Sequence, residues 1–186
     1  MFNKIRPIFT LMLICAISSL AILNIEKITK VYIIKQQQEI VLAGYKEVFP
    51  QLGEIKKLDT AIDNKVINEV VASVTGGEVN GYIYTVKPDG YSGEIVTMLA
   101  FDVKEKKITG IKILNQHETP GLGAKCKEKD FTGMFVGKTA AQPLNLVKAN
   151  GSDNDIQAIT AATITSKAVV NGVNTARVHF ENLVLN

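Results

Sequence analysis

Four hydroxyl side chains gather within seven residues in the stretch AITAATITSKAVVNGV, which begins at Ala158. They are Thr160, Thr163, Thr165 and Ser166, and a helical pattern follows them directly. The first N–H groups of a helix lack intrahelical partners, and its N-terminal end is electropositive. We therefore expect Thr165 or Ser166 to cap a helix that runs from about Ser166 to Leu183, at a site suited to a phosphate. On these residues alone, a simple capped helix is the better explanation.

A second stretch, ETPGLGAK, spans Glu118 to Lys125. Gly121 and Gly123 free the backbone to turn and to approach a flat ring closely. Leu122 is then placed to cover one face of such a ring, and Thr119 and backbone amides to bond its polar edge. An ordinary glycine-rich loop between sheet and helix explains the same residues equally well.

The elements that must position these two stretches follow from the pattern of the remaining chain. Short alternating segments rich in Val, Ile, Tyr and Thr are separated by turns such as PDGYSG and KEKK. Such segments predict β-strands joined by hairpin turns. We expect long strands at 65–74, 81–87, 94–103 and 108–114, a short helix at 126–138, and brief strands at 144–149 and 155–159. The fold class is therefore α+β, with a mainly antiparallel sheet and flanking helices.

The beginning of the chain is apolar. Residues 7–25 carry no charge, and as a helix they would extend roughly 28 Å, about the thickness of a bilayer's hydrocarbon core. We expect a single transmembrane helix with a cytoplasmic N-terminus; a cleaved signal peptide is the alternative. A stalk helix is predicted after it, ended by Pro50. The expected organisation is an anchor at 1–25, a stalk at 26–50 and one domain at 51–186.

Composition excludes several classes of function. A net charge of +3 without a basic run argues against nucleic-acid binding. Two histidines and two cysteines, with no CxxC, predict no metal site and no disulfide framework. Cys126 is expected to be a structural thiol.

The two stretches together resemble the hallmarks of the FMN-binding domain family, over a region from Gly81 to the C-terminus. Thr160, Ala162 and Thr163 match the family's attachment motif, whereas Ala161 and Gln157 stand where glycine and an acidic residue are usual. The resemblance implies that FMN is joined by a phosphoester to Thr163, and that a flavin transferase installs it. The other implied contacts are Thr160, Ala161, Ala162, Ile164, Thr165, Ser166, Glu118, Thr119, Gly121, Leu122, Gly123, Lys125 and Lys148.

Within this family, the chain is most similar to the G subunits of Rnf ion-translocating ferredoxin:NAD oxidoreductase complexes. A longer relative is the C subunit of the sodium-translocating NADH:quinone reductase. The resemblance implies an electron-transfer subunit in the cell membrane, with the FMN domain on the outer side and without turnover alone. Its implied partners are other membrane and redox subunits, the flavin transferase and membrane lipid. A stand-alone anchored flavin reductase and a flavin-free structural subunit are the alternatives.

Overall fold

The structure is a computed structural model that describes residues 10–16, 18–19, 29, 39–58, 65–149, 151 and 153–185. It divides the chain into two compact units, Met1–Leu42 and Ala43–Asn186. Residues 10–16 and 18–19 are helical. Among the described residues, no helix has both the length and the apolar character needed to cross a membrane. Most of the predicted anchor and part of the predicted stalk lie outside the described residues, and residues 39–48 of the stalk are helical as expected.

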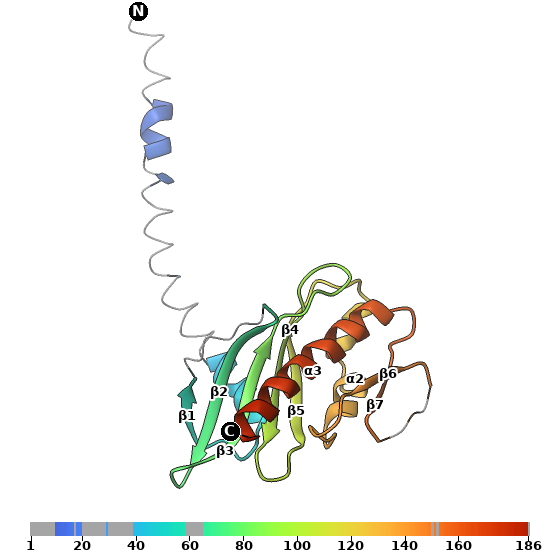
Figure 1. Cartoon of the computed structure of the whole chain (residues 1–186). Helices are drawn as coiled ribbons and strands as arrows, with labels where there is room; N and C mark the ends of the chain where they lie inside the picture. The colour runs from blue at the N-terminus through green and yellow to red at the C-terminus, as the bar shows by residue number, and fades with distance from the viewer. Residues whose placement is uncertain are drawn as a thin grey trace, which may run out of the picture. The chain divides into compact units, whose positions relative to one another are not determined.

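A five-stranded sheet forms the centre of the second unit (Figure 1). Its strands are β1 Glu54–Lys57, β2 Ile67–Thr75, β3 Glu78–Val86, β4 Val96–Asp102 and β5 Ile108–Asn115. They pair in sequence order, and every neighbouring pair is antiparallel. The four long strands β2 to β5 confirm the prediction that was made from the alternating pattern of the sequence. The short edge strand β1 was not predicted.

The two faces of the sheet are covered by different elements. Helix α3, Thr163–Leu185, crosses one face (Figure 1), where Phe180 stacks on Phe101 with ring centroids 4.7 Å apart. Residues 43–49 cover the opposite face, where the Thr109 hydroxyl donates to the Val48 carbonyl at 2.7 Å. Phe49 is buried there as well. The alternation of side chains along each strand therefore fills two apolar layers.

The chain between β5 and α3 lies beside the sheet. It contains the 3₁₀ helices η1 Gly123–Lys127 and η2 Gly133–Phe135, the short helix α2 Lys129–Thr132, and strands β6 Asn145–Val147 and β7 Asp155–Gln157. The prediction of one helix over 126–138 was wrong, because this segment forms three short helical pieces. Gly133 ends α2, and Gly137 has a positive φ of 80°. The two brief predicted strands are confirmed, and they pair in parallel.

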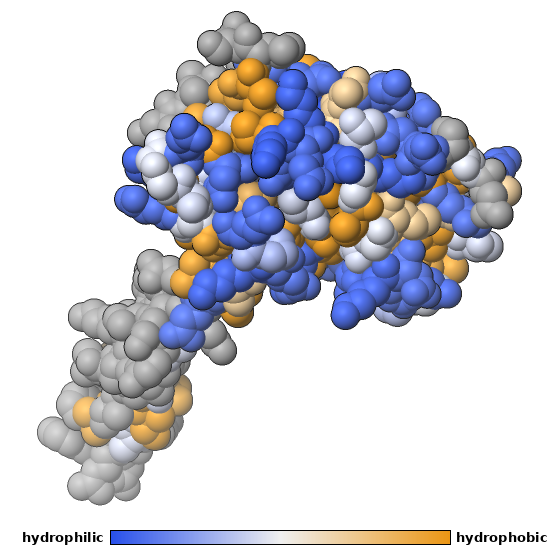
Figure 2. Space-filling view, turned by 90° about the horizontal axis from the view of Figure 1, so that it is seen from below, coloured by the Kyte–Doolittle hydropathy of each residue, from blue (hydrophilic) through white to orange (hydrophobic). Residues whose placement is uncertain are grey.

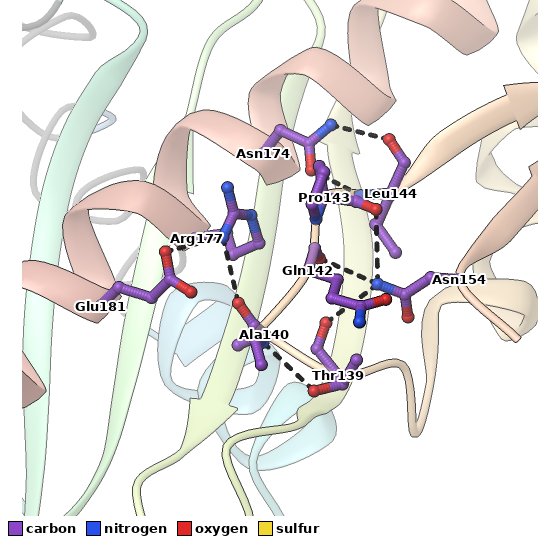
Figure 3. Close-up of polar contacts among 10 residues, drawn as sticks. Thr139, Ala140, Gln142, Pro143, Leu144, Asn154, Asn174, Arg177 and Glu181 are labelled. Carbon is purple, nitrogen blue, oxygen red and sulfur yellow. Dashed lines mark hydrogen bonds and ion pairs between the residues drawn. The ribbon is translucent and has the colours of Figure 1, made fainter.

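Polar contacts tie this connection to α3 (Figure 3). The Asn174 carboxamide accepts from the Leu144 N–H and donates to the Leu144 carbonyl, both at 2.9 Å. Arg177 donates to the Ala140 carbonyl at 3.2 Å and pairs with Glu181 at 2.7 Å. Asn154 donates to the Gln142 carbonyl at 2.8 Å. These bonds hold the segment that leads towards the first turn of α3.

The surface of this unit is mixed. On the face seen in Figure 2, hydrophilic residues predominate, and hydrophobic residues lie between them in separate patches. Folded domains generally present such a mixture to solvent. Exposed apolar residues therefore call for an explanation only where they gather around a hollow.

Candidate functional site

Three segments that are far apart in the sequence meet at one cleft of about 560 Å³. They are the turn after β3, the loop after β5, and the beginning of α3. The lining residues are Tyr91, Glu118, Thr119, Leu122, Gly123, Ala161, Ala162, Thr163, Ile164 and Thr165. A cleft of this size can hold a ligand as large as a nucleotide cofactor. Both chemistry-bearing stretches of the sequence contribute to it.

Helix α3 begins at Thr163, three residues earlier than predicted. Thr165 and Ser166 therefore lie within the first turn, and the prediction that one of them caps the helix was wrong. The Ser166 hydroxyl donates to the Ala162 carbonyl at 2.9 Å and accepts from the Ile159 N–H at 3.0 Å. Ser166 is fully buried, and these two bonds hold the chain that enters the helix.

The first turn of α3 leaves donors available at the cleft. The Ser166 N–H makes the first intrahelical bond, to the Ala162 carbonyl at 3.0 Å. Within the described part of the chain, no acceptor bonds the N–H groups of Thr163, Ile164 or Thr165. Thr163 is exposed and is the first residue of this long helix, so it lies at the electropositive end. Such an end suits a phosphate.

The chain enters this turn through an unusual backbone conformation. Ala161 has a φ of 60°, which lies in the left-handed region. A Cβ atom disfavours this region, and glycine occupies it freely. The geometry therefore explains why a glycine would suit this position.

Glu118 joins all three segments of the cleft. Its Oε1 atom accepts from the N–H groups of Tyr91 and Ser92, both at 2.9 Å. Its Oε2 atom accepts from the Thr165 hydroxyl at 2.5 Å. The side chain is 5% exposed. The sequence resemblance placed Glu118 near the cofactor, but nothing in the sequence indicated its bond to a residue 47 positions away.

Gly123 makes room for this junction. A Cβ atom there would lie 2.5 Å from Glu118 Oε2 and 2.7 Å from Thr165 Oγ1. Gly90 is comparable, since its Cβ would lie 2.5 Å from Glu118 Oε1. Gly121 supports the turn of the loop with a φ of 78°. The first role of Gly123 is thus to admit the Glu118 carboxylate.

Three large apolar side chains surround the mouth of the cleft. Leu122 is 42% exposed, Ile164 56% and Tyr91 70%. Leu122 and Ile164 were predicted site residues, whereas Tyr91 was missed. The available signal was an aromatic residue in the turn PDGYSG, where the neighbours are turn formers and offer no core to fill. A flat ring in the cleft would contact apolar groups from three segments.

Five predicted site residues do not belong to the lining of the cleft, and one of them is Gly121 in the turn of the loop. Thr160 and Lys125 line a neighbouring hollow of about 280 Å³. Ser166 is buried behind the first turn of α3, and Lys148 is exposed and does not belong to the residues that line the cleft. The implied contacts of Lys125 and Lys148 with the cofactor therefore stay predictions.

The nearby thiol is a structural group. Cys126 is fully buried. Burial, and secondarily the Glu118 charge, raises the pKa of its thiol to about 11. A thiol of this kind is a weak nucleophile at neutral pH. Within the described residues, no group of His, Cys, Asp and Glu side chains could hold a metal ion.

Comparisons with known proteins agree with a cofactor site at the cleft. Residues 90–178 match the model of the FMN-binding domain, a range that contains all three segments of the cleft. The G subunit of the Na⁺-translocating ferredoxin:NAD⁺ oxidoreductase complex of Acetobacterium woodii is 42% identical over 118 residues, which are 62% of this chain and 56% of that protein. The chain thus spans about half the length of the first curated relatives it matches.

A second relative covers more of both chains. The G subunit of the ion-translocating oxidoreductase complex of Aliivibrio fischeri is 33% identical over 177 residues, 87% of this chain and 83% of that protein. Among solved structures, the C subunit of the Na⁺-translocating NADH–quinone reductase of Parabacteroides distasonis has a TM-score of 0.57 at 21% identity. That match covers 73% of this chain and 79% of the other, and it shows a shared fold.

Proposed function

This chain belongs to the family of G subunits of ion-translocating oxidoreductase complexes and contains an FMN-binding domain, and from that premise we propose that it carries electrons on a covalently held FMN. Its place would be an Rnf-type membrane complex that couples electron flow between ferredoxin and NAD to ion transport. The observation that carries the proposal is the exposed Thr163 hydroxyl at the start of α3, in a cleft with an apolar rim.

Thr163 is proposed to bear the flavin through a phosphoester. Its hydroxyl and the N–H groups of the first turn of α3 lie on the same wall of the cleft. The helix end would stabilise the negative phosphate diester. Thr160 lies in the neighbouring hollow and Thr165 is buried against Glu118, so Thr163 is the exposed threonine of this stretch that lines the cleft.

The ring is proposed to lie among Tyr91, Leu122 and Ile164. These side chains would cover its apolar faces and exclude water. Thr119 lies on the same lining and would donate to the ring's polar edge. FMN supplies one- and two-electron redox chemistry when it is bound, and the protein contributes position and electrostatics.

The two departures from the attachment motif do not exclude this function. Ala161 already adopts the left-handed conformation that a glycine would favour, so the backbone path is kept. Gln157 is exposed at the end of β7, where a flavin transferase could reach it. We propose that such an enzyme installs the flavin on this chain.

The remaining parts of the proposal concern location and partners. The charge-free run at 7–25 motivates a single membrane anchor in contact with lipid. The names of the relatives motivate other membrane and redox subunits as partners. We place the FMN-binding domain on the outer side of the cell membrane.

Co-expression with a flavin transferase tests the proposal. The purified protein should be yellow, and its band on a denaturing gel should fluoresce under ultraviolet light. Protein made without the transferase should give a dark band. A colourless protein after co-expression would support a flavin-free structural subunit, and reduction of an external acceptor by the isolated protein would support a stand-alone reductase.

A further inference from the structure

Glu118 places a carboxylate on the wall of the cleft, and we propose that its negative charge lowers the reduction potential of the flavin held there. This inference rests on the proposed function, because it assumes that the cleft holds a flavin. It assigns to Glu118 a positioning and electrostatic role. Glu118 itself neither gives nor accepts an electron.

The groups around Glu118 suit an ionised carboxylate. Two backbone N–H groups, from Tyr91 and Ser92, point at one oxygen, and the Thr165 hydroxyl points at the other. Backbone N–H groups can only donate. Hydrogen bonds from such donors to a carboxylate are stronger than bonds between neutral groups. The charge is thus held in a defined place.

The surroundings also fix the position of the carboxylate. The side chain is 5% exposed, and its two oxygens lie against Gly90 and Gly123, where a Cβ atom would approach them to 2.5 Å. A rotation of the side chain would break bonds to two different segments. The charge therefore cannot move away from the cleft in response to a change on the ring.

Cationic side chains do not neutralise this charge within the described structure. None of the described ion pairs involves Glu118. Among the ten residues that line the cleft, Glu118 is the one with an acidic or basic side chain.

An electron added to the ring without a proton adds one negative charge. Because the carboxylate is buried, water screens its repulsion of that charge only weakly. The oxidised ring is therefore favoured.

Glu118→Gln tests the charge with little change of shape. The amide oxygen can accept from Tyr91 and Ser92, while the amide nitrogen donates to the Thr165 hydroxyl. The full chain, flavinylated by co-expression, is reduced stepwise with dithionite in the presence of mediator dyes. The midpoint potential of Glu118→Gln should be more positive than that of the wild type. Melting temperature and visible spectrum are recorded on the same samples.

Two further variants separate charge from structure. Glu128→Gln removes a negative charge from an exposed residue outside the cleft lining, and its potential should stay at the wild-type value. Thr165→Val removes the hydroxyl bond but keeps the carboxylate, so its potential should not become more positive. Equal positive shifts in Glu118→Gln and Thr165→Val would overturn the proposal, because a structural disturbance would explain both.

The outcomes also separate this inference from the proposed function. A wild-type protein without flavin contradicts the proposed function itself. A flavinylated Glu118→Gln protein with an unchanged potential contradicts only the role of Glu118. If Glu118→Gln does not acquire flavin, Glu118→Asp withdraws the charge by one methylene group and should give a smaller positive shift. An unchanged potential in that variant would equally overturn the proposal.

Discussion

Ala161 is an alanine in a backbone conformation that favours glycine. Its φ of 60° brings the chain from β7 into the first turn of α3. For an L-residue with a Cβ atom, this conformation costs about 1 kcal/mol or more. Ala162, the next residue, is buried and directly precedes the helix. The two neighbouring alanines therefore offer a matched pair for substitution by glycine.

We expect Ala161→Gly to keep or raise the free energy of unfolding, by up to about 1 kcal/mol, because relief of strain outweighs the added freedom of the unfolded chain. Ala162→Gly should lower the free energy of unfolding by about 1 kcal/mol. This substitution increases the freedom of the unfolded chain and removes a buried methyl group, and no positive φ is relieved at this position. Urea unfolding of the two variants measures the difference. Equal destabilisation by both would show that Ala161 is not strained.

At the scale of the elements, the cleft depends on contacts between a loop and a helix. Gly123→Ala would place a Cβ 2.5 Å from Glu118 Oε2 and 2.7 Å from Thr165 Oγ1. The loop and α3 must then separate, at a cost of about 1–3 kcal/mol. We also expect a changed visible spectrum of the flavinylated protein, because both sides of the cleft move.

Gly133→Ala is the control for this substitution. A Cβ at Gly133 would meet no atom within 4 Å, and its backbone is in the right-handed helical region. Its free energy of unfolding should stay within about 0.5 kcal/mol of the wild type. A Gly123→Ala variant as stable as Gly133→Ala, with an unchanged spectrum, would show that the loop and α3 do not meet as described.

The connection before α3 offers a second prediction at this scale. Asn174→Ala would leave the N–H and carbonyl of the buried Leu144 without the two bonds shown in Figure 3. Each unsatisfied buried group costs about 1–3 kcal/mol, so the variant should be clearly less stable. Amide hydrogen exchange should increase in residues 139–147. The control is Thr175→Ala, since that hydroxyl bonds only the preceding turn at Asn171. Protection of 139–147 as in the wild type would contradict this account.

The sequence predicted the elements better than their junctions. The alternating pattern of residues 81–87 and 94–103 identified β3 and β4, because local side-chain periodicity reflects burial on a sheet. The start of α3 was placed too late, because Thr165 and Ser166 have the side chains of caps but do not cap the helix: the Thr165 hydroxyl donates to Glu118, and the Ser166 hydroxyl donates to the carbonyl of Ala162, which precedes the first turn. The roles of Glu118 and Tyr91 depend on segments brought together by the fold, and local pattern does not encode such contacts.

At the scale of the whole molecule, stability should depend on pH through His179. Its ring bonds the Tyr84 hydroxyl at 3.1 Å, and burial lowers the pKa of His179 below 6.5. The folded protein then resists protonation that the unfolded chain accepts. The contribution is fully present above the unfolded pKa, and it is lost as the pH falls through the folded pKa.

His179→Gln should therefore weaken the loss of stability between about pH 8 and about pH 5.5, the interval in which an ordinary histidine titrates. The exposed His117 provides the control, since His117→Gln should retain the wild-type dependence. Urea midpoints at the two pH values measure both. A wild-type dependence in His179→Gln would mean that other groups control the pH response.

The central claim is that FMN is esterified to Thr163, and a peptide mass tests it most directly. Trypsin should release residues 149–167, which contain Thr160, Thr163, Thr165 and Ser166. After co-expression with a flavin transferase, we expect this peptide to gain the mass of one FMN less one water, with fragmentation that places the addition on Thr163. Thr163→Ala should yield the unmodified peptide. An unmodified wild-type peptide, or an addition that remains on Thr160 or Thr165 in Thr163→Ala, would contradict the account.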